Sequence, residues 1–105
     1  MAQFVLEISH PPDQCPTANA KVRKLQLPAA ADLPSLGKKL GVKFLAGPLV
    51  TTEHRSIAIV EAREEEAIRP FALQSGMIRY NSIKVSPGIP MEQAIAELND
   101  LDPIY

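Results

Sequence analysis

The spacing of apolar residues changes along the chain between the two-residue period of strands and the longer period of helices. Apolar and polar residues alternate over Gln3–His10, which predicts a first strand that the two following prolines end. One face of this strand carries Phe4, Leu6, Ile8 and His10. The pattern leaves open whether that face is buried, because a shift of one residue inverts a strand.

Three further strands are predicted. The strongest is Arg55–Ala62, because its middle is a short apolar run rich in β-branched residues, as in strands that are covered on both faces. Val42–Thr51 precedes it, and the Gly47-Pro48 pair inside that segment marks an edge strand or a bulge. Met77–Val85 is predicted as the last strand, with a turn at Ser86–Gly88 after it.

Helical spacing fills the segment between the first two strands. Thr17 is a suitable cap for a helix over Ala18–Leu27, and Pro28 is expected to interrupt that helix. A second piece is expected over Asp32–Leu40, and Gly41 is a fitting C-terminal stop. The first helical region should therefore be broken in two.

The second half of the chain predicts two more helices. Arg63–Ser75 carries glutamates near its N-terminus, where the helix dipole favours negative charge, and Pro70 inside it predicts a kink or a restart. Pro90–Leu98 is predicted as a short terminal helix with Ile95 and Leu98 facing the core. Asp100–Tyr105 is expected to form a loose tail.

The predicted order is β-α-β-β-α-β followed by a terminal helix, which is the ferredoxin-like arrangement of α+β proteins. Right-handed crossovers place the strands of an antiparallel sheet in the spatial order 4-1-3-2, with the helices on one face. Residues 1–105 are expected to form a single domain of this kind. The uncovered face is an association hazard, so we expect a second copy of the chain to cover it in a homodimer.

Charge and cysteine content exclude several classes of function. Eleven Lys and Arg against twelve Asp and Glu give a formal net charge of -1, which argues against a nucleic-acid binder. There is no signal-peptide pattern, and no apolar stretch approaches the ~20 residues that span a bilayer, so no membrane partner is expected. The single cysteine cannot form an intrachain disulfide and suits a reducing compartment, so we expect a cytoplasmic protein.

The predicted topology brings together residues that are far apart in the sequence. His10 and Cys15 lie at or just after the end of the first strand, and His54 precedes the third strand, which is its neighbour. Imidazole and thiolate are preferred ligands of zinc and related transition metals. Three such ligands leave a position for water or a substrate, so these residues form a candidate metal site. A possible pocket nearby includes Glu7, Glu53, Tyr80 and Asn81.

Other interpretations of the same residues remain open. Cys15 could act as a nucleophile, with a histidine as its base and Asn81 or Glu53 orienting that histidine. Alternatively, His10 ends a strand, His54 is a solvated loop residue and Cys15 is a small buried hydrophobe. No local motif such as CxxC or HExxH decides among these hypotheses.

With the strands in this order, the chain resembles the dimeric α/β-barrel group of ferredoxin-like proteins. It is similar to a small bacterial and archaeal family of unassigned function in the stretches Gly41–Lys43, Ala46-Gly47, Glu53-His54, Ile59–Ala62 and Tyr80–Ser82. The resemblance implies two subunits that pack their sheets face to face, with pockets between sheet and helices. The wider group includes cofactor-independent monooxygenases, haem-degrading enzymes, muconolactone isomerase-like enzymes and ligand-sensing domains. No catalytic set of those enzymes is matched here residue by residue.

We therefore expect a small cytoplasmic homodimer that binds a transition metal such as zinc, or a small-molecule ligand, near His10, Cys15 and His54. One alternative is a dimeric-barrel enzyme, monooxygenase-like or isomerase-like, with a pocket between sheet and helices. Another is a structural or regulatory module that binds a partner through the open sheet face or the edge strand. Bound metal, a pocket and the oligomer mass distinguish the three hypotheses.

Overall fold

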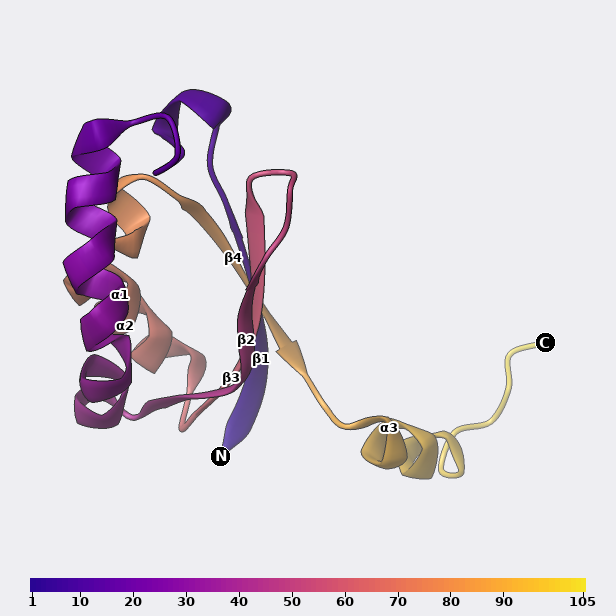
Figure 1. Cartoon of the computed structure of the whole chain (residues 1–105). Coiled ribbons are helices and arrows are strands. Elements are labelled where there is room, and N and C mark those ends of the chain that lie inside the picture. Colours follow the sequence, from indigo (N-terminus) through magenta and orange to yellow (C-terminus); the bar gives the residue numbers. More distant parts are fainter.

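The structure, a computed structural model, describes all residues 1–105. Its strands are β1 (Ala2–Ser9), β2 (Val42–Val50), β3 (Arg55–Ala62) and β4 (Ser82–Gly88), and its α-helices are α1 (Ala20–Leu40), α2 (Ile68–Gln74) and α3 (Met91–Leu98). The strands form one antiparallel sheet in the order β2-β3-β1-β4, and α1 and α2 lie together on one face of it (Figure 1). This is the predicted α+β class and strand order, and it is consistent with a ferredoxin-like arrangement.

The alternation along β1 buries one of its faces against the helices. Phe4, Leu6 and Ile8 are all buried on that face. β1 pairs with β3 so that Leu6 lies opposite Ala58, and both residues are 1% exposed. Because alternate residues of a strand share one face, the two central strands together present a continuous apolar layer. Phe71 of α2 is fully buried in the cluster that this layer forms with the helices.

The first helix, α1, is continuous over 21 residues, so the predicted break at Pro28 was wrong. Its N-cap is Asn19 rather than Thr17, because the Asn19 side chain accepts a hydrogen bond from a first-turn N–H at 3.0 Å. Pro28 and Pro34 lie on the exposed side, where solvent can replace the helical bond that a carbonyl loses to a proline. Gly41 ends the helix as expected, with φ 75°. Neither α1 nor the shorter helices have the length and apolarity that crossing a membrane requires.

The prediction for β2 and β3 is confirmed. β3 has the predicted bounds, and β2 ends at Val50, one residue earlier than expected. β2 lies at the edge of the sheet, and its pairing with β3 shifts twice between Phe44 and Leu49. The Gly47-Pro48 pair lies within this irregular stretch, as expected for a bulged edge strand.

The segment between β3 and β4 differs in part from the prediction. The helix expected from Arg63 begins as a 3-10 turn and restarts as α2, which places Pro70 in the first turn, where its missing N–H costs no helical bond. The strand expected from Met77 starts instead as a 3-10 turn, and β4 begins only at Ser82. β4 then continues through Pro87, where a turn was expected, because an edge strand tolerates proline.

The terminal helix, α3, lies apart from the rest of the molecule. In Figure 1 it follows the far end of β4, on the side of the sheet opposite to α1 and α2. Ile95 and Leu98 were expected to face the core, but they are 54% and 63% exposed, and no residue of α3 is buried. The prediction failed because β4 carries the chain to the end of the sheet before the helix begins. The residues after Leu101 form no helix or strand.

Candidate metal centre and adjoining cleft

Two of the predicted ligands are held together by backbone pairing at the end of the central strands where β1 ends and β3 begins. This end of the sheet is here called the site edge. His10 follows β1, and His54 precedes β3. The backbone N–H of His10 donates to the carbonyl of His54 at 3.1 Å, which extends the ladder between these strands. The two imidazole rings meet edge to face, with centroids 5.5 Å apart. Strand pairing therefore makes neighbours of two histidines that are distant in sequence.

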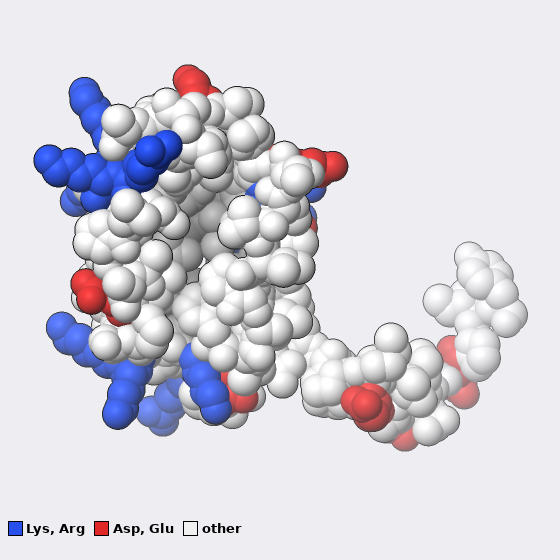
Figure 2. Space-filling model, in the orientation of Figure 1, with Lys and Arg blue, Asp and Glu red and all other residues white.

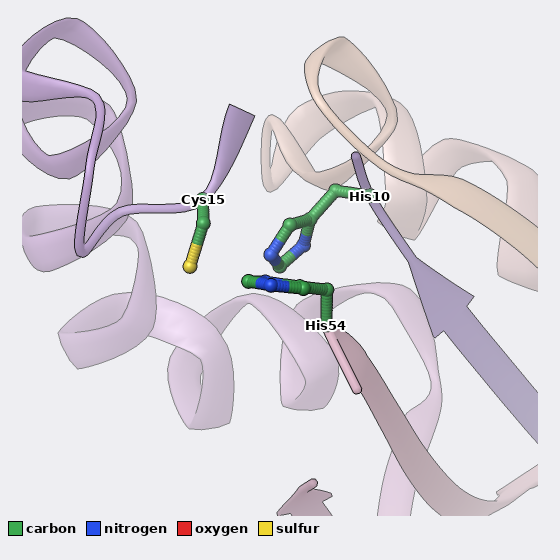
Figure 3. Close-up of side chains that lie close together, drawn as sticks. All are labelled: His10, Cys15 and His54. Atoms are coloured by element: carbon green, nitrogen blue, oxygen red, sulfur yellow. The ribbon is translucent and has the colours of Figure 1, made fainter. Parts of the chain in front are cut away.

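His54 has a backbone conformation that is uncommon outside glycine, with φ 58°. The left-handed region costs a residue with a Cβ roughly 1–2 kcal/mol. The turn is held by Thr51, whose N–H and hydroxyl both donate to the Arg55 carbonyl, at 2.8 Å and 3.1 Å. Strain of this kind persists only where the surrounding structure imposes it, and it concentrates at functional sites. Here it accompanies an imidazole that points toward His10 (Figure 3).

Cys15 approaches the histidines from the loop between β1 and α1. The prolines after β1 lead into a 3-10 turn, η1 (Pro12–Gln14), which Cys15 ends by donating its N–H to the Pro12 carbonyl at 3.2 Å. The Cys15 carbonyl accepts from the N–H groups of Ala18 and Asn19, at 2.9 Å and 2.8 Å. The residue is thus fixed on both sides, and it is 8% exposed.

The three side chains point toward one another (Figure 3). The ligand atoms of His10, Cys15 and His54 all lie within 4.8 Å of one another. They come from three separate segments: the end of β1, the loop before α1 and the turn before β3. The structure therefore brings together the residues that the sequence suggested as metal ligands.

The contact between His10 and Asn81 determines the tautomer of the neutral His10 ring. The Asn81 side-chain amide donates to the Met77 carbonyl at 3.0 Å, which turns its Oδ1 toward His10. Because Oδ1 only accepts, the His10 Nδ1, 3.0 Å away, must carry the proton. Nε2 is then an unprotonated acceptor, and it is buried without a hydrogen-bond partner. A buried lone pair left without a partner is costly, and it is the atom type through which imidazole binds metals.

The environment of Cys15 favours the thiolate. Its Sγ lies 3.0 Å from Oγ1 of Thr17, the hydroxyl of which donates when the sulfur is ionised. Hydrogen bonds from the Thr17 side chain and the Thr17 backbone are the two largest causes that lower the pKa of Cys15 from 9.0 to about 6, against the opposing effect of burial. Near neutral pH the thiolate therefore predominates, and it is the form that ligates metals and attacks electrophiles.

A cleft of about 700 Å³ opens beside the three side chains, with walls from the sheet and from α1. This volume suits a small molecule. The residues that line it include His10, Cys15, His54, Tyr80 and Asn81, and none of the lining residues is Asp, Glu, Lys or Arg. Figure 2 shows the hollow between helices and sheet bordered by uncharged residues. The cleft therefore offers little attraction to a strongly charged ligand except at the His and Cys cluster.

Tyr80 supplies a hydroxyl group to this cleft. Its ring centroid lies 6.5 Å from that of His10. Burial raises the pKa of Tyr80 above its ordinary value of 10.0 and outweighs the hydrogen bond with Asn81, which lowers it. The phenol is therefore neutral over the physiological range, and it can donate a hydrogen bond to a molecule in the cleft.

Two of the predicted pocket residues lie elsewhere. Glu7 has the opposite parity to Leu6 and lies on the open face of the sheet, where its Oε2 is 3.7 Å from Nζ of Lys84. It borders a separate hollow of about 240 Å³ on that face. Glu53 is exposed and does not line the cleft, because it lies in the tight turn before His54. The parity of β1 and the left-handed turn account for these two corrections.

Sequence reasoning missed the contributions of α1 and Thr17. The predicted break at Pro28 hid a continuous helix face at positions i, i+3, i+4 and i+7, mostly of apolar residues, that walls the cleft. These residues are Gln26, Ala29, Ala30 and Leu33. Thr17 follows Cys15 by two residues, and this spacing, with the tendency of Thr side chains to bond to nearby groups, was the available signal.

Comparisons of the chain with protein-family models and with curated proteins find no match. The resemblance to the dimeric α/β-barrel group therefore stays a prediction. The function has to be inferred from the geometry of the site edge and of the cleft beside it.

Proposed function

We propose that the protein binds a transition metal ion, in the first instance zinc, through His10, Cys15 and His54. The observation that carries the proposal is the buried, unpartnered Nε2 of His10 in a ring whose Nδ1–H is held by Asn81. Metal-bound imidazoles usually donate their other ring N–H to a fixed acceptor in this way, which sets the tautomer. One thiolate and two imidazoles form a ligand set that suits zinc.

The cluster needs a small closure to hold the ion. Bonds of about 2.0–2.1 Å to nitrogen and 2.3 Å to sulfur place the ligand atoms of a tetrahedral zinc roughly 3.3–3.6 Å apart. The ligand atoms here lie within 4.8 Å of one another, so they have to approach one another by only ~1 Å to reach that geometry. The low pKa of Cys15 favours binding, because little proton release is then needed near neutral pH.

Three protein ligands leave a fourth coordination position for water or a small molecule. The same three residues line the cleft, so a molecule bound there reaches the metal directly. Tyr80, whose ring centroid lies 6.5 Å from that of His10, offers that molecule a hydrogen-bond donor. We therefore propose an open, ligand-accepting metal site rather than a closed structural one.

Elemental analysis tests this proposal. The untagged protein is loaded with zinc, dialysed and measured beside His54→Ala and Cys15→Ser, with Glu53→Ala as the matched control from the same turn. We expect near-stoichiometric zinc in the parent and in the control, and loss of zinc in the other two variants. Cobalt substitution should add a sulfur-to-cobalt charge-transfer band that Cys15→Ser removes. Equal, substoichiometric zinc in all four proteins would overturn the proposal.

A second candidate function is nucleophilic chemistry by the Cys15 thiolate. The 3.0 Å contact between His10 Nδ1 and Asn81 Oδ1 favours it, because the same contact that prepares Nε2 for a metal also prepares it as a base for the thiol. The dimeric-barrel enzyme considered above would use the same cleft. The strained backbone of His54 has no role in such a Cys-His-Asn arrangement, and this favours the metal.

The rate of alkylation by iodoacetamide separates the two candidates. For a nucleophilic site, the rate should fall in His10→Ala and stay nearly unchanged in His54→Ala. For a metal site, zinc should protect Cys15 from alkylation in the parent, and a chelator should restore the rate. Protection by zinc that persists in His54→Ala would remove His54 from the ligand set.

We also propose that the chain forms a homodimer through the open face of the sheet. Leu49, Ile57 and Ile59 are 68%, 44% and 37% exposed there, and exposed apolar patches mark association sites. A regulatory or structural role would use the same face. The reduced state that Cys15 needs suits the cytoplasm. Light scattering over a range of concentrations measures the mass of the protein in solution. A monomer at all concentrations would contradict the proposed homodimer.

A further inference from the structure

Residues Ile89–Tyr105, here called the C-terminal arm, have an apolar side that nothing in the chain covers. Met91, Ile95 and Leu98 recur at the spacing of one helix face, and they are 71%, 54% and 63% exposed. An isolated helix of eight residues is marginal in water, so most of its stability must come from packing. The arm therefore has the composition of a segment that packs against another surface.

The arm extends away from its own sheet. The radius of gyration is 16.3 Å, whereas about 13 Å is expected for a compact chain of this length. Only Ile89 and Pro90 separate β4 from α3, and the proline ring restricts the link, with φ -57° at Pro90. In Figure 1 this link directs α3 outward, on the side of the open sheet face but away from that face. A second chain is therefore better placed to receive the arm than its own sheet.

The arm and the rest of the chain carry opposite charge. The arm holds Glu92, Glu97, Asp100 and Asp102 and no Lys or Arg. All eleven Lys and Arg lie before it, together with the other eight of the twelve acidic residues. In Figure 2 the arm shows acidic residues only, whereas the body shows both signs with clusters of Lys and Arg. Electrostatic attraction therefore favours contact between an arm and the body of another copy.

The open sheet face has matching features. Its apolar centre is formed by Leu49, Ile57 and Ile59, which lie on the two neighbouring strands β2 and β3. Lys43 and Arg55 lie near the two ends of this strand pair and are exposed on the same face. That face also carries Lys84 and the carboxylates of Glu7 and Glu61. An amphipathic helix that is acidic on one side and apolar on the other fits such a surface in the way that helices bind apolar grooves.

We infer that the C-terminal arm of one copy packs on the open sheet face of a second copy, and that the exchange is reciprocal. Met91, Ile95 and Leu98 cover the apolar centre of that face, and the acidic residues of the arm lie toward its Lys and Arg. A two-fold axis makes the two contacts identical, as in most homodimers. This inference rests on the proposed homodimer and specifies which segment forms it.

Sedimentation of paired arm variants tests the inference. Ile95→Asp places a charge in the apolar side of the arm, whereas Gln93→Asp adds the same charge on its polar side. Both residues are exposed in the single chain, so neither substitution should unfold it. We expect the dimer dissociation constant to rise about tenfold or more in Ile95→Asp, because one side chain buried at the centre of the interface is lost. It should stay nearly unchanged in Gln93→Asp.

Cross-linking identifies the receiving surface. Protein with Leu98→Cys and Cys15→Ser is mixed with protein carrying Ile57→Cys and Cys15→Ser, and the mixture is mildly oxidised. We expect a covalent dimer of the two different chains, and much less of it when Gln93→Cys replaces Leu98→Cys.

The outcomes separate the arm from the dimer itself. A dimer that Ile95→Asp leaves intact and that forms no arm-to-face cross-link overturns the inference, while the proposed homodimer stands. A monomer at all concentrations overturns both. If one chain carrying both new cysteines closes on itself at high dilution, the arm folds on its own sheet, and the inference is wrong.

Discussion

The two ends of the sheet are completed in opposite ways. At the site edge, β1 and β3 are extended by a backbone hydrogen bond between His10 and His54, and Cys15 is fixed by three more backbone bonds. At the other end, β4 passes into an arm that has no buried residue in its helix. At the site edge, the Nε2 atom of His10 is buried and has no hydrogen-bond partner. The apolar side chains of the arm, in contrast, are exposed.

This difference indicates two different kinds of partner. An unpaired buried polar atom costs about 1–3 kcal/mol, and a single ion or polar group relieves that cost. An exposed apolar side chain gains roughly 1.5–3 kcal/mol when it is fully buried, which requires an extended surface. We therefore assign a small ligand to the site edge and a protein surface to the arm.

The largest expected effect is on the free energy of unfolding, and it comes from the core between the two ends of the sheet. Phe71 is fully buried between the helices and the sheet, so Phe71→Ala should lower the free energy of unfolding by about 3–5 kcal/mol. Ile104→Ala in the arm, where the side chain is 90% exposed, should change it by less than about 0.5 kcal/mol. Urea denaturation of dilute, metal-free protein measures both. Similar losses would show that the arm already belongs to the folded core of one chain.

A smaller effect concerns metal affinity at the site edge. Asn81→Ala removes the acceptor that holds the His10 Nδ1–H and should weaken zinc binding about 10–100-fold. Asn81→Asp keeps an acceptor at that position and should retain most of the affinity. Competition with a zinc-sensitive dye measures the dissociation constants. Equal affinity in all three proteins would mean that the Asn81 contact does not prepare His10 for a metal.

The pH dependence of Cys15 gives a third test. In metal-free protein, the alkylation rate should rise with a midpoint near the Cys15 pKa of about 6. Thr17→Val removes the largest cause of that low pKa and should move the midpoint upward. Because the pKa is lower in the folded state, the stabilisation from the thiolate is complete above pH 9 and is lost as the pH falls through 6.

The contribution of Thr17 can therefore be read from stability as well as from reactivity. The difference in unfolding free energy between the parent and Thr17→Val should grow between pH 6 and pH 9. An unchanged alkylation midpoint in Thr17→Val would assign the low pKa to the histidines instead. An alkylation midpoint that moves upward in His10→Ala would also assign the low pKa of Cys15 to the histidines.

The smallest expected effect is the strain at His54. Glycine adopts positive φ without a steric penalty, so His54→Gly should stabilise the metal-free protein by roughly 0.5–1 kcal/mol while it removes a ligand. Glu53→Gly is the matched control, and it should not stabilise. Thermal unfolding without metal measures both. A destabilised His54→Gly would show that the imidazole contributes packing that outweighs the backbone strain.

The sequence was a good guide wherever local pattern and topology agreed. Alternation in β1 and the apolar middle of β3 defined the sheet, and the strand order then brought His10 and His54 to one edge. The predictions that rested on prolines were wrong where the energetic cost of the proline depends on its exposure to solvent. A sequence alone does not give that exposure. Pro28 lies on the outside of an unbroken helix, and Pro87 lies within an edge strand.

The parts of the site that escaped prediction depend on single contacts. The face that Glu7 occupies could not be assigned until the parity of β1 was known, and Glu7 then fell on the open face. The Asn81 contact with His10 joins residues that are distant in sequence, and its geometry depends on the carbonyl of Met77. Which nitrogen of His10 is left free follows only from these two contacts together.

The distribution of tyrosines gives the protein an optical reporter for each of its two contrasting regions. The chain has no tryptophan and only two tyrosines. Tyr80 lies in the cleft beside His10, and Tyr105 lies on the exposed arm. A paramagnetic ion such as cobalt at the site edge should quench the emission of Tyr80, whereas packing of the arm should change the anisotropy of Tyr105. Replacing either residue by Phe leaves one emitter, so the two events can be followed separately without an added label.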